Sequence, residues 1–266
     1  MELLNKVRLL IKLWRDHDNS ASTLASLLFY SKLKRQKTIS IKIFGEDIYI
    51  RTSTNDLGVA LSSLEKEFKS LSLAYTKDYK GLIIDAGGYI GTTAIAFAKM
   101  YPGATIISIE PSTENFEILK RNIRNYTNIY AHNAALMPKS FAGCITLLDL
   151  GTGYWGFTVI EKPKNGSANF IEKVDVISIE KILEEYGYDK IMIFKMDIEG
   201  TEYYFFKQSD WLEKTNVLIV ELHEGNVPGC KQAFEDANKL RFVYKDRGEK
   251  FISIGKQYFV NGFFKQ

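Results

Sequence analysis

The stretch from Gly81 to Thr92, GLIIDAGGYIGT, decides the fold of this 266-residue chain. It begins as a short apolar run typical of a buried strand, passes through a glycine-rich turn and meets a helical pattern at Thr92. Glycines permit positive φ angles and a close approach of the backbone to a ligand, and Gly91 lets the following helix pack near the strand. A strand, a glycine loop and a helix in this order predict a nucleotide-type loop from Asp85 to Gly91.

Strand and helix patterns alternate after this loop. They comprise a helix over 92–100, the strand ATIISIEP (104–111), a helix over 113–125, the strand NIYAHNAAL (128–136), the strand ITLLDL (145–150), the amphipathic ISIEKILEEYGY (177–188), the strand KIMIFKMDIEG (190–200), a helix over 201–209, the strand NVLIVELHE (216–224) and a helix near 229–240. The chain then ends in RFVYKDRGEKFISIGKQYFVNG (241–262), which predicts antiparallel strands. We therefore expect an α/β fold, Rossmann-like, with a mostly parallel sheet, helices on both faces and an antiparallel C-terminal hairpin.

The residues before the loop follow other patterns. Apolar positions at helical spacing over 2–36, broken at Asp18-Asn19-Ser20, predict two short amphipathic helices. The segment TISIKIFGEDIYIRTST (38–54) alternates apolar and polar residues around Gly45-Glu46-Asp47, which predicts a β-hairpin, and 56–75 is helical again. We expect a helical extension over 1–37, a hairpin and helix over 38–79, and the α/β domain over 80–266.

Composition excludes some classes of protein. The 35 basic and 32 acidic residues give a net charge of only +3, too balanced to favour nucleic acid as the main partner. Cys144 and Cys230 match neither a metal-binding spacing nor a disulfide framework. Charges interrupt the apolar start of the chain, so we expect no signal peptide, no transmembrane segment and a cytoplasmic location.

The N-terminal helices are expected to cap the main domain or to form a homodimer contact. Weak membrane-surface contact is the less favoured alternative. It is suggested by the basic residues Lys6, Arg8, Lys12, Lys32, Lys34 and Arg35.

The ligand of the loop has two candidates. The pattern Ala86-x-Gly88-x-x-Gly91 is a degenerate dinucleotide fingerprint and, with Glu110 downstream, would by itself be a weak signal for NAD. Asp85 at the mouth of the loop would repel a pyrophosphate, whereas it suits the ammonium and sulfonium of S-adenosylmethionine. The residues therefore favour S-adenosylmethionine as cofactor, with an NAD-type nucleotide-binding protein as the alternative from a different class.

Other cofactor contacts are expected at the carboxyl ends of the next strands, where open α/β folds bind ligands. Glu110 ends the strand ATIISIE, and its two carboxylate oxygens can accept hydrogen bonds from both ribose hydroxyls. Pro111 starts the next helix. Asn133 could bond a base edge and Ala134 could leave room for adenine, although a turn and a helix cap explain these two residues equally well.

Two later segments carry candidate catalytic residues. KMDIEGTE follows a buried strand, and Asp197 is the first choice for contact with the methionine end of the cofactor or for the base. Glu202 is interpreted as an acid at a helix start. Glu221 and His223 lie one residue apart at the end of the next strand, and histidine suits proton transfer near neutral pH. A divalent metal on such Asp, Glu and His side chains ranks below metal-free catalysis, because no dense ligand motif supports it.

The chain resembles the FkbM family of methyltransferases, named for a macrolide O-methyltransferase. The family typically carries D-x-G-A-N-x-G, E-P, K-x-D-I-E-G-x-E and E-x-H, which correspond here to DAGGYIG, EP, KMDIEGTE and ELH between Asp85 and His223. The resemblance implies a class I, S-adenosylmethionine-dependent methyltransferase domain over roughly 40–266. It also implies O-methylation of a hydroxyl on a sugar or glycan-related acceptor, with N-methylation or O-methylation of another small molecule or natural product as alternatives. Gly88 and Tyr89 stand where Ala and Asn are usual, so Tyr89 is expected to stack over the cofactor or to gate the site.

The motifs and the resemblance together give three sets of expected site residues. The cofactor set is Asp85, Ala86, Gly87, Gly88, Tyr89, Gly91, Thr92, Glu110, Pro111, Asn133, Ala134 and Asp197. The catalytic set is Asp197, Glu221 and His223. The acceptor set is Tyr154, Trp155 and Glu199, because the Gly- and aromatic-rich segment LDLGTGYWGFTVIEKP (148–163) could form a stacking wall.

Overall fold

A seven-stranded sheet forms the centre of the computed structural model, which describes residues 11–68, 71, 75–154, 156–160, 168–246 and 250–259. The strand order is β12-β13-β11-β10-β3-β4-β5. The parallel strands are β3 (Leu82–Ala86), β4 (Thr105–Ile109), β5 (Ile129–His132), β10 (Ile191–Met196) and β11 (Thr215–Glu221). The antiparallel pair at one edge is β12 (Arg241–Lys245) and β13 (Lys250–Gly255).

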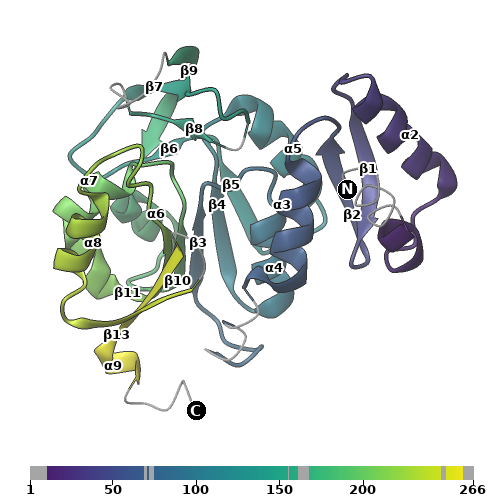
Figure 1. Ribbon diagram of the computed structural model, residues 1–266. Coiled ribbons are helices and arrows are strands. Elements are labelled where there is room, and N and C mark those ends of the chain that lie inside the picture. The colour runs from purple at the N-terminus through teal and green to yellow at the C-terminus, as the bar shows by residue number, and fades with distance from the viewer. Residues whose placement is uncertain are drawn as a thin grey trace.

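Helices cover both faces of this sheet (Figure 1). One face packs against α4 (Thr92–Met100) and α5 (Thr113–Ile123), and the other packs against α6 (Ile179–Tyr186), α7 (Glu202–Lys207) and α8 (Cys230–Ala237). Successive strand residues enter opposite cores, because side chains alternate along a strand. Ile83 packs with α4, whereas Ile84 packs with α6 to α8. The predicted fold, including the C-terminal hairpin, is confirmed.

The order in which successive strands are added to the sheet reverses at its centre, between β3 and β10. From β3 the strands proceed to β4 and β5 on one side, and from β10 to β11 on the other. In open α/β sheets, ligands bind in the crevice beyond the carboxyl ends of the strands at such a reversal. The loop after β3 and the segment after β10 border this crevice.

The predicted N-terminal hairpin is confirmed as β1 (Thr38–Ile43) paired with β2 (Glu46–Arg51). Its turn lies one position earlier than expected, at Phe44 and Gly45, whose φ angles of 50° and 84° suit a two-residue hairpin loop. The hairpin packs on α5, where the side chain of Asn122 bonds both the backbone N–H and the carbonyl of Tyr49, at 2.6 and 3.1 Å.

The helices around this hairpin match the predicted pattern in part. α2 (Ala21–Lys32) follows the predicted break, residues 11–15 are helical, and the rest of the first predicted helix, with Lys6 and Arg8, lies outside the described residues. The helical pattern over 56–75 becomes α3 (Asp56–Ser62) and a π-helical turn, η1 (Ser63–Glu67). None of the helices in the described part of the chain is long and apolar enough to cross a membrane.

The segment ITLLDL forms a strand, but the expectation that it continues the central sheet is wrong. The segment ITLLDL forms most of β7 (Cys144–Asp149), which lies outside the central sheet. It belongs to a second sheet with β6 (Ala135–Leu136), β8 (Phe157–Thr158) and β9 (Asn169–Ile177). β9 was not predicted because its charged residues Glu172, Lys173 and Asp175 give it the polarity of a loop. The predicted strand over 128–136 is split into β5 and β6.

Candidate active site

The glycine loop lies against the segment that follows β10. Gly87 has a φ of 78°, and a Cβ at this position would lie 1.9 Å from the backbone oxygen of Asp197. The N–H groups of Gly87 and Gly88 both donate to the carbonyl of Ile109, at 3.0 and 2.9 Å. Gly91, with a φ of 83°, precedes the first residue of α4. Glycine at 87 is therefore required by both the backbone conformation and the close approach.

Tyr89 connects the loop to the N-terminal part of the chain. Its backbone adopts a φ of 50°, its N–H donates to Glu110 Oε2 at 2.8 Å, and its hydroxyl donates to Asp56 Oδ1 at 2.5 Å. Asp56 also forms a buried ion pair with Arg51, at 2.9 Å between Oδ2 and Nε. Burial and the Asp56 carboxylate raise the pKa of Tyr89, so its hydroxyl remains a donor. These contacts hold the side chain at the cavity wall in this structure, and its stacking or gating role stays a prediction.

Glu110 lies at the end of β4 with its carboxylate almost fully enclosed. Oε1 accepts hydrogen bonds from Ser112 N and Asn115 Nδ2, at 3.0 and 3.1 Å, while Oε2 accepts from Tyr89 N. Burial raises the pKa of Glu110 to about 7. Each carboxylate oxygen can accept two hydrogen bonds, so Oε2 retains capacity for a ligand hydroxyl.

Asp85 lies beneath the loop and not at its mouth. It is fully buried, accepts a hydrogen bond from Ser108 Oγ at 3.0 Å and lies 3.5 Å from Lys195 Nζ. Burial raises the pKa of this carboxyl. The expected position of Asp85 at the mouth of the loop is thus corrected, whereas its contact with the cofactor's charges stays a prediction.

Lys195 is a site residue absent from the predicted sets. Its Nζ donates to the carbonyls of Gly87 and Ala86, at 2.8 and 3.2 Å, and lies 3.5 Å from both Asp85 and Asp197. Burial alone would lower the pKa of Lys195, but the carboxylates of Asp197 and Asp85 outweigh it and raise the pKa. The sequence signal that could have identified Lys195 is its position as a charged residue within the apolar run IMIFKM.

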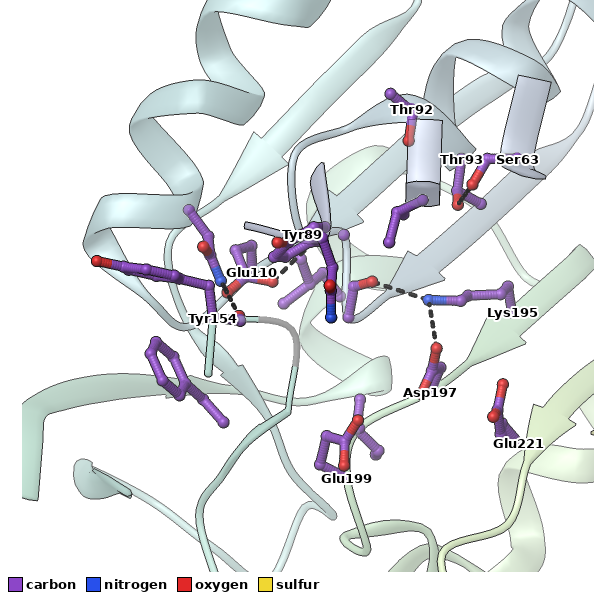
Figure 2. Close-up of a pocket in the computed structure, with 18 of the residues that line it drawn as sticks. Ser63, Tyr89, Thr92, Thr93, Glu110, Tyr154, Lys195, Asp197, Glu199 and Glu221 are labelled. Atoms are coloured by element: carbon purple, nitrogen blue, oxygen red, sulfur yellow. Dashed lines mark hydrogen bonds and ion pairs between the residues drawn. The ribbon is translucent and has the colours of Figure 1, made fainter. Parts of the chain in front are cut away.

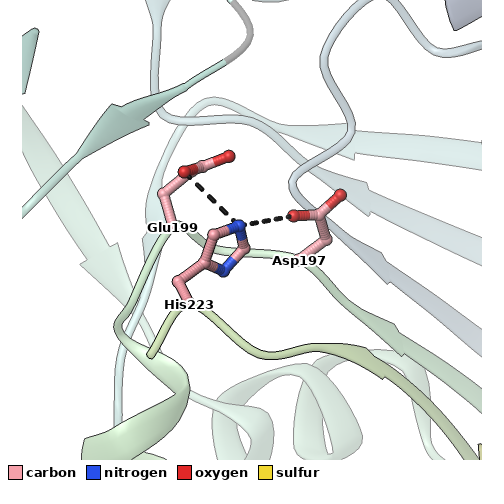
Figure 3. A group of neighbouring side chains, drawn as sticks. All are labelled: Asp197, Glu199 and His223. Atoms are coloured by element: carbon pink, nitrogen blue, oxygen red, sulfur yellow. Dashed lines mark ion pairs between the residues drawn. The ribbon is translucent and has the colours of Figure 1, made fainter. Parts of the chain in front are cut away.

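Three side chains predicted as catalytic or acceptor residues meet beyond β10 and β11 (Figure 3). His223 Nε2 lies 3.4 Å from Glu199 Oε2 and 3.7 Å from Asp197 Oδ1. Its Nδ1 lies 3.1 Å from Oε1 of the fully buried Glu202, which also accepts hydrogen bonds from Ile198 N and Gly200 N. Glu202 was interpreted only as a helix-start acid, and its contact with His223 was missed.

The surroundings of His223 bear on its role as base, which stays a prediction. Burial alone would lower the pKa of this imidazole, but Glu202 and Glu199 outweigh burial and raise the pKa to about 12. This raised pKa favours the protonated form of His223, which pairs with the surrounding carboxylates. The pKa of Asp197 is lowered, because Lys195 and His223 together outweigh its burial.

A cavity of about 720 Å³ opens between the loop and these carboxylates, a volume within the usual range of ligand pockets. Figure 2 shows Glu110 and Tyr154 toward one end and Asp197 and Glu221 toward the other. The N-terminal part of the chain supplies one wall through residues of α3 and η1, among them Leu57, Leu61 and Ser63. The sequence predicted a helix over this region without placing it at the site.

Many of the expected site residues line this cavity. These are Gly87, Gly88, Tyr89, Thr92, Glu110, Pro111, Tyr154, Asp197, Glu199 and Glu221. Tyr154 lies near Glu110, and Asn115 Nδ2 donates to the backbone carbonyl of Tyr154 at 2.8 Å, while its role toward the acceptor stays a prediction.

Six other expected residues do not line the cavity, as far as the described part of the chain shows. These are Asp85, Ala86, Gly91, Asn133, Ala134 and His223. Ala135 and Leu136 line it where Asn133 and Ala134 were expected. The side chain of Asn133 instead donates to the carbonyls of Glu110 and Pro111, at 3.0 and 2.9 Å, and so stabilises the turn after β4. Trp155 lies outside the described residues.

The strand order, the glycine loop after β3 and the enclosed acid after β4 define the architecture of a class I methyltransferase. Residues 85–251 match the family model described as the methyltransferase FkbM domain, which is more than half of the chain. The chain belongs to the FkbM methyltransferase family. It is therefore an S-adenosylmethionine-dependent methyltransferase, as the sequence motifs predicted.

Curated relatives and a solved structure are similar to the chain. Methyltransferase 1 of Beauveria bassiana (strain ARSEF 2860) is 24% identical over 166 residues, which are 53% of this chain and 66% of that protein. The chain thus matches less than two thirds of that relative's length. Methyltransferase sdnD of Sordaria araneosa is 24% identical over 231 residues, 71% of this chain and 87% of that protein. The structure of M. jannaschii TYW2 in complex with AdoMet has 10% identity and a TM-score of 0.38, and covers 83% of this chain and 84% of that chain.

Proposed function

We propose that the chain transfers a methyl group from S-adenosylmethionine to a hydroxyl of a carbohydrate or a similar polyhydroxylated acceptor. The observation that carries this proposal is the set of carboxylates at one end of the cavity, Asp197, Glu199 and Glu221. Ionised carboxylates are hydrogen-bond acceptors only, and the hydroxyls of a sugar are donors that suit them.

The residues of the cavity fit the cofactor. Glu110 retains an accepting position for the ribose hydroxyls, and the apolar side chains of Leu136 and Phe157 line the same cavity as candidates for adenine contact. Asp197, toward the other end and next to the glycine loop, suits the positive charges of the methionine part. We assign Gly87, Gly88 and Glu110 to the cofactor on this basis.

The chain must orient the acceptor and remove its proton, because the bound cofactor supplies a methyl group that its sulfonium already activates. Burial and the nearby Asp197 raise the pKa of Glu221, which brings this carboxylate closer to the pH range in which a general base works well. Glu221 would take the proton of the acceptor hydroxyl, and the bound cofactor would supply the activated methyl group to that oxygen. The apolar wall of α3 limits the access of water.

Incubation with methyl-labelled S-adenosylmethionine tests the acceptor class. The panel contains nucleotide sugars, oligosaccharides, small phenols and primary amines, each analysed by mass spectrometry for an added methyl group. We expect labelling of hydroxyl oxygen in the sugar compounds. Labelling confined to the amines would refute the O-methyl proposal.

A further inference from the structure

Two carboxylate oxygens and one imidazole nitrogen lie close together at the end of the cavity. They belong to Asp197, Glu199 and His223. Asp197 and Glu199 lie in the segment after β10, and His223 lies just after β11, the adjacent parallel strand. One ligand atom from each of the three lies within 4.8 Å of the others. Atoms at about 2.1 Å from a common cation are at most about 4.2 Å apart, so a small movement of one side chain suffices to enclose an ion.

Glu202 holds the imidazole in the orientation that a metal ligand needs. Its carboxylate is fully buried and fixed by two backbone N–H groups, and it takes Nδ1 of His223 as a third donor at 3.1 Å. Nε2 is thereby directed at Asp197 and Glu199. A carboxylate behind a histidine is the arrangement that orients metal-bound imidazoles in proteins.

The cluster also carries excess negative charge. Three carboxylates, those of Asp197, Glu199 and Glu202, surround one imidazole. Lys195 lies near Asp197, but it is shared with Asp85. Within the described residues, the carboxylate of Glu199 forms no ion pair with a lysine or arginine, although only 11% of its side chain is exposed. The ion pair of Glu199 is with His223, so a single imidazolium offsets the three carboxylates, and a divalent cation would offset their charge more fully.

We propose that Asp197, Glu199 and His223 bind one divalent cation of the Mn²⁺ or Zn²⁺ type, which takes the place of the proton on Nε2. A mixed imidazole and carboxylate set with three protein ligands suits these ions and leaves coordination positions open. Asp197 and Glu199 line the cavity, so the open positions face the acceptor end. There the ion would orient a hydroxyl oxygen of the acceptor, a role that rests on the proposed function.

Titration of the chelator-treated full-length chain tests the site. Mn²⁺ is followed by the loss of its free electron paramagnetic resonance signal, and Zn²⁺ by calorimetry. We expect one equivalent of ion per chain, and at least about 10-fold weaker binding in Glu199→Gln and in His223→Gln. The matched control, His132→Gln, changes a histidine that contacts Tyr186 and should bind as the wild type does. Failure of both ions to bind, or equal binding in all variants, would overturn the proposal.

Spectroscopy on the wild-type chain keeps the test independent of how the variants fold. Electron spin echo modulation of the Mn²⁺ complex should contain the coupling of one directly bound imidazole nitrogen, and its absence would contradict the assignment of His223. Binding of S-adenosylhomocysteine reports whether each variant is folded. Methylation of hydroxyls without metal binding overturns this site alone, whereas metal binding with methylation only of amines overturns the proposed acceptor and leaves the site.

Discussion

The affinity for S-adenosylhomocysteine should depend on pH through Glu110. Burial favours the neutral form of this carboxyl and raises its pKa to about 7, whereas ribose hydroxyls bond best to the ionised form. Binding should therefore strengthen as pH rises through about 7 and should release a proton. If only the ionised form binds, the ionised fraction rises from about 3% at pH 5.5 to about 90% at pH 8, a gain of roughly 30-fold in affinity.

Calorimetry at several pH values, in buffers of different ionisation enthalpy, measures both the affinity and the proton release. Glu110→Gln should remove the pH dependence and weaken binding at pH 8 by about 10- to 150-fold, since charged hydrogen bonds contribute about 1.5–3 kcal/mol. Glu114→Gln, at a half-exposed position on α5, is the matched control and should retain the wild-type profile. A flat profile for the wild type, or the same slope in Glu110→Gln, would refute the role of Glu110.

Three further substitutions have definite expected outcomes. Gly87→Ala should abolish cofactor binding in calorimetry, because its Cβ would lie 1.9 Å from the carbonyl oxygen of Asp197. Tyr89→Phe should lower the free energy of unfolding in urea by about 1–3 kcal/mol, because it leaves the buried Asp56 without one donor. Glu221→Gln should lower kcat by about 10²- to 10⁴-fold and leave the affinity for S-adenosylhomocysteine nearly unchanged.

Each of these substitutions has a control and a contradicting result. Gly58→Ala in α3 meets no atom within 4 Å and should not destabilise the chain, so equal effects at 58 and 87 would exclude the steric argument. Unfolding of Tyr89→Phe at the wild-type urea concentration would show that the bond to Asp56 contributes nothing. Glu213→Gln, in the 3-10 helix Ser209–Lys214 before β11, should keep the full kcat, and unchanged kcat in Glu221→Gln would remove Glu221 as the base.

The fold was predictable from the sequence because its signals are local. The run GLIID, the glycines after it and the helical spacing from Thr92 all lie within one strand-loop-helix unit, and the later strands repeat its apolar pattern. β9 was not predictable in the same way. It is held between β7 and β6 in the second sheet, and these pairings join segments that are distant in the sequence.

The site was predictable as a set of motifs but not as a set of contacts. Asp85 was expected at the mouth of the loop, yet the register of β3 and β10 pairs it with Lys195, a residue 110 positions away. That pairing depends on the sheet and leaves no local pattern. The contact of Tyr89 with Asp56 likewise depends on how α3 packs over the loop.

A crystal structure of the chain with S-adenosylhomocysteine tests the central claim most directly. We expect a ribose hydroxyl within hydrogen-bond distance of Glu110 Oε2, which has one accepting position left, and the sulfur directed toward Asp197 and Glu221. Adenosine bound away from Glu110, or a sulfur directed away from these carboxylates, would contradict it.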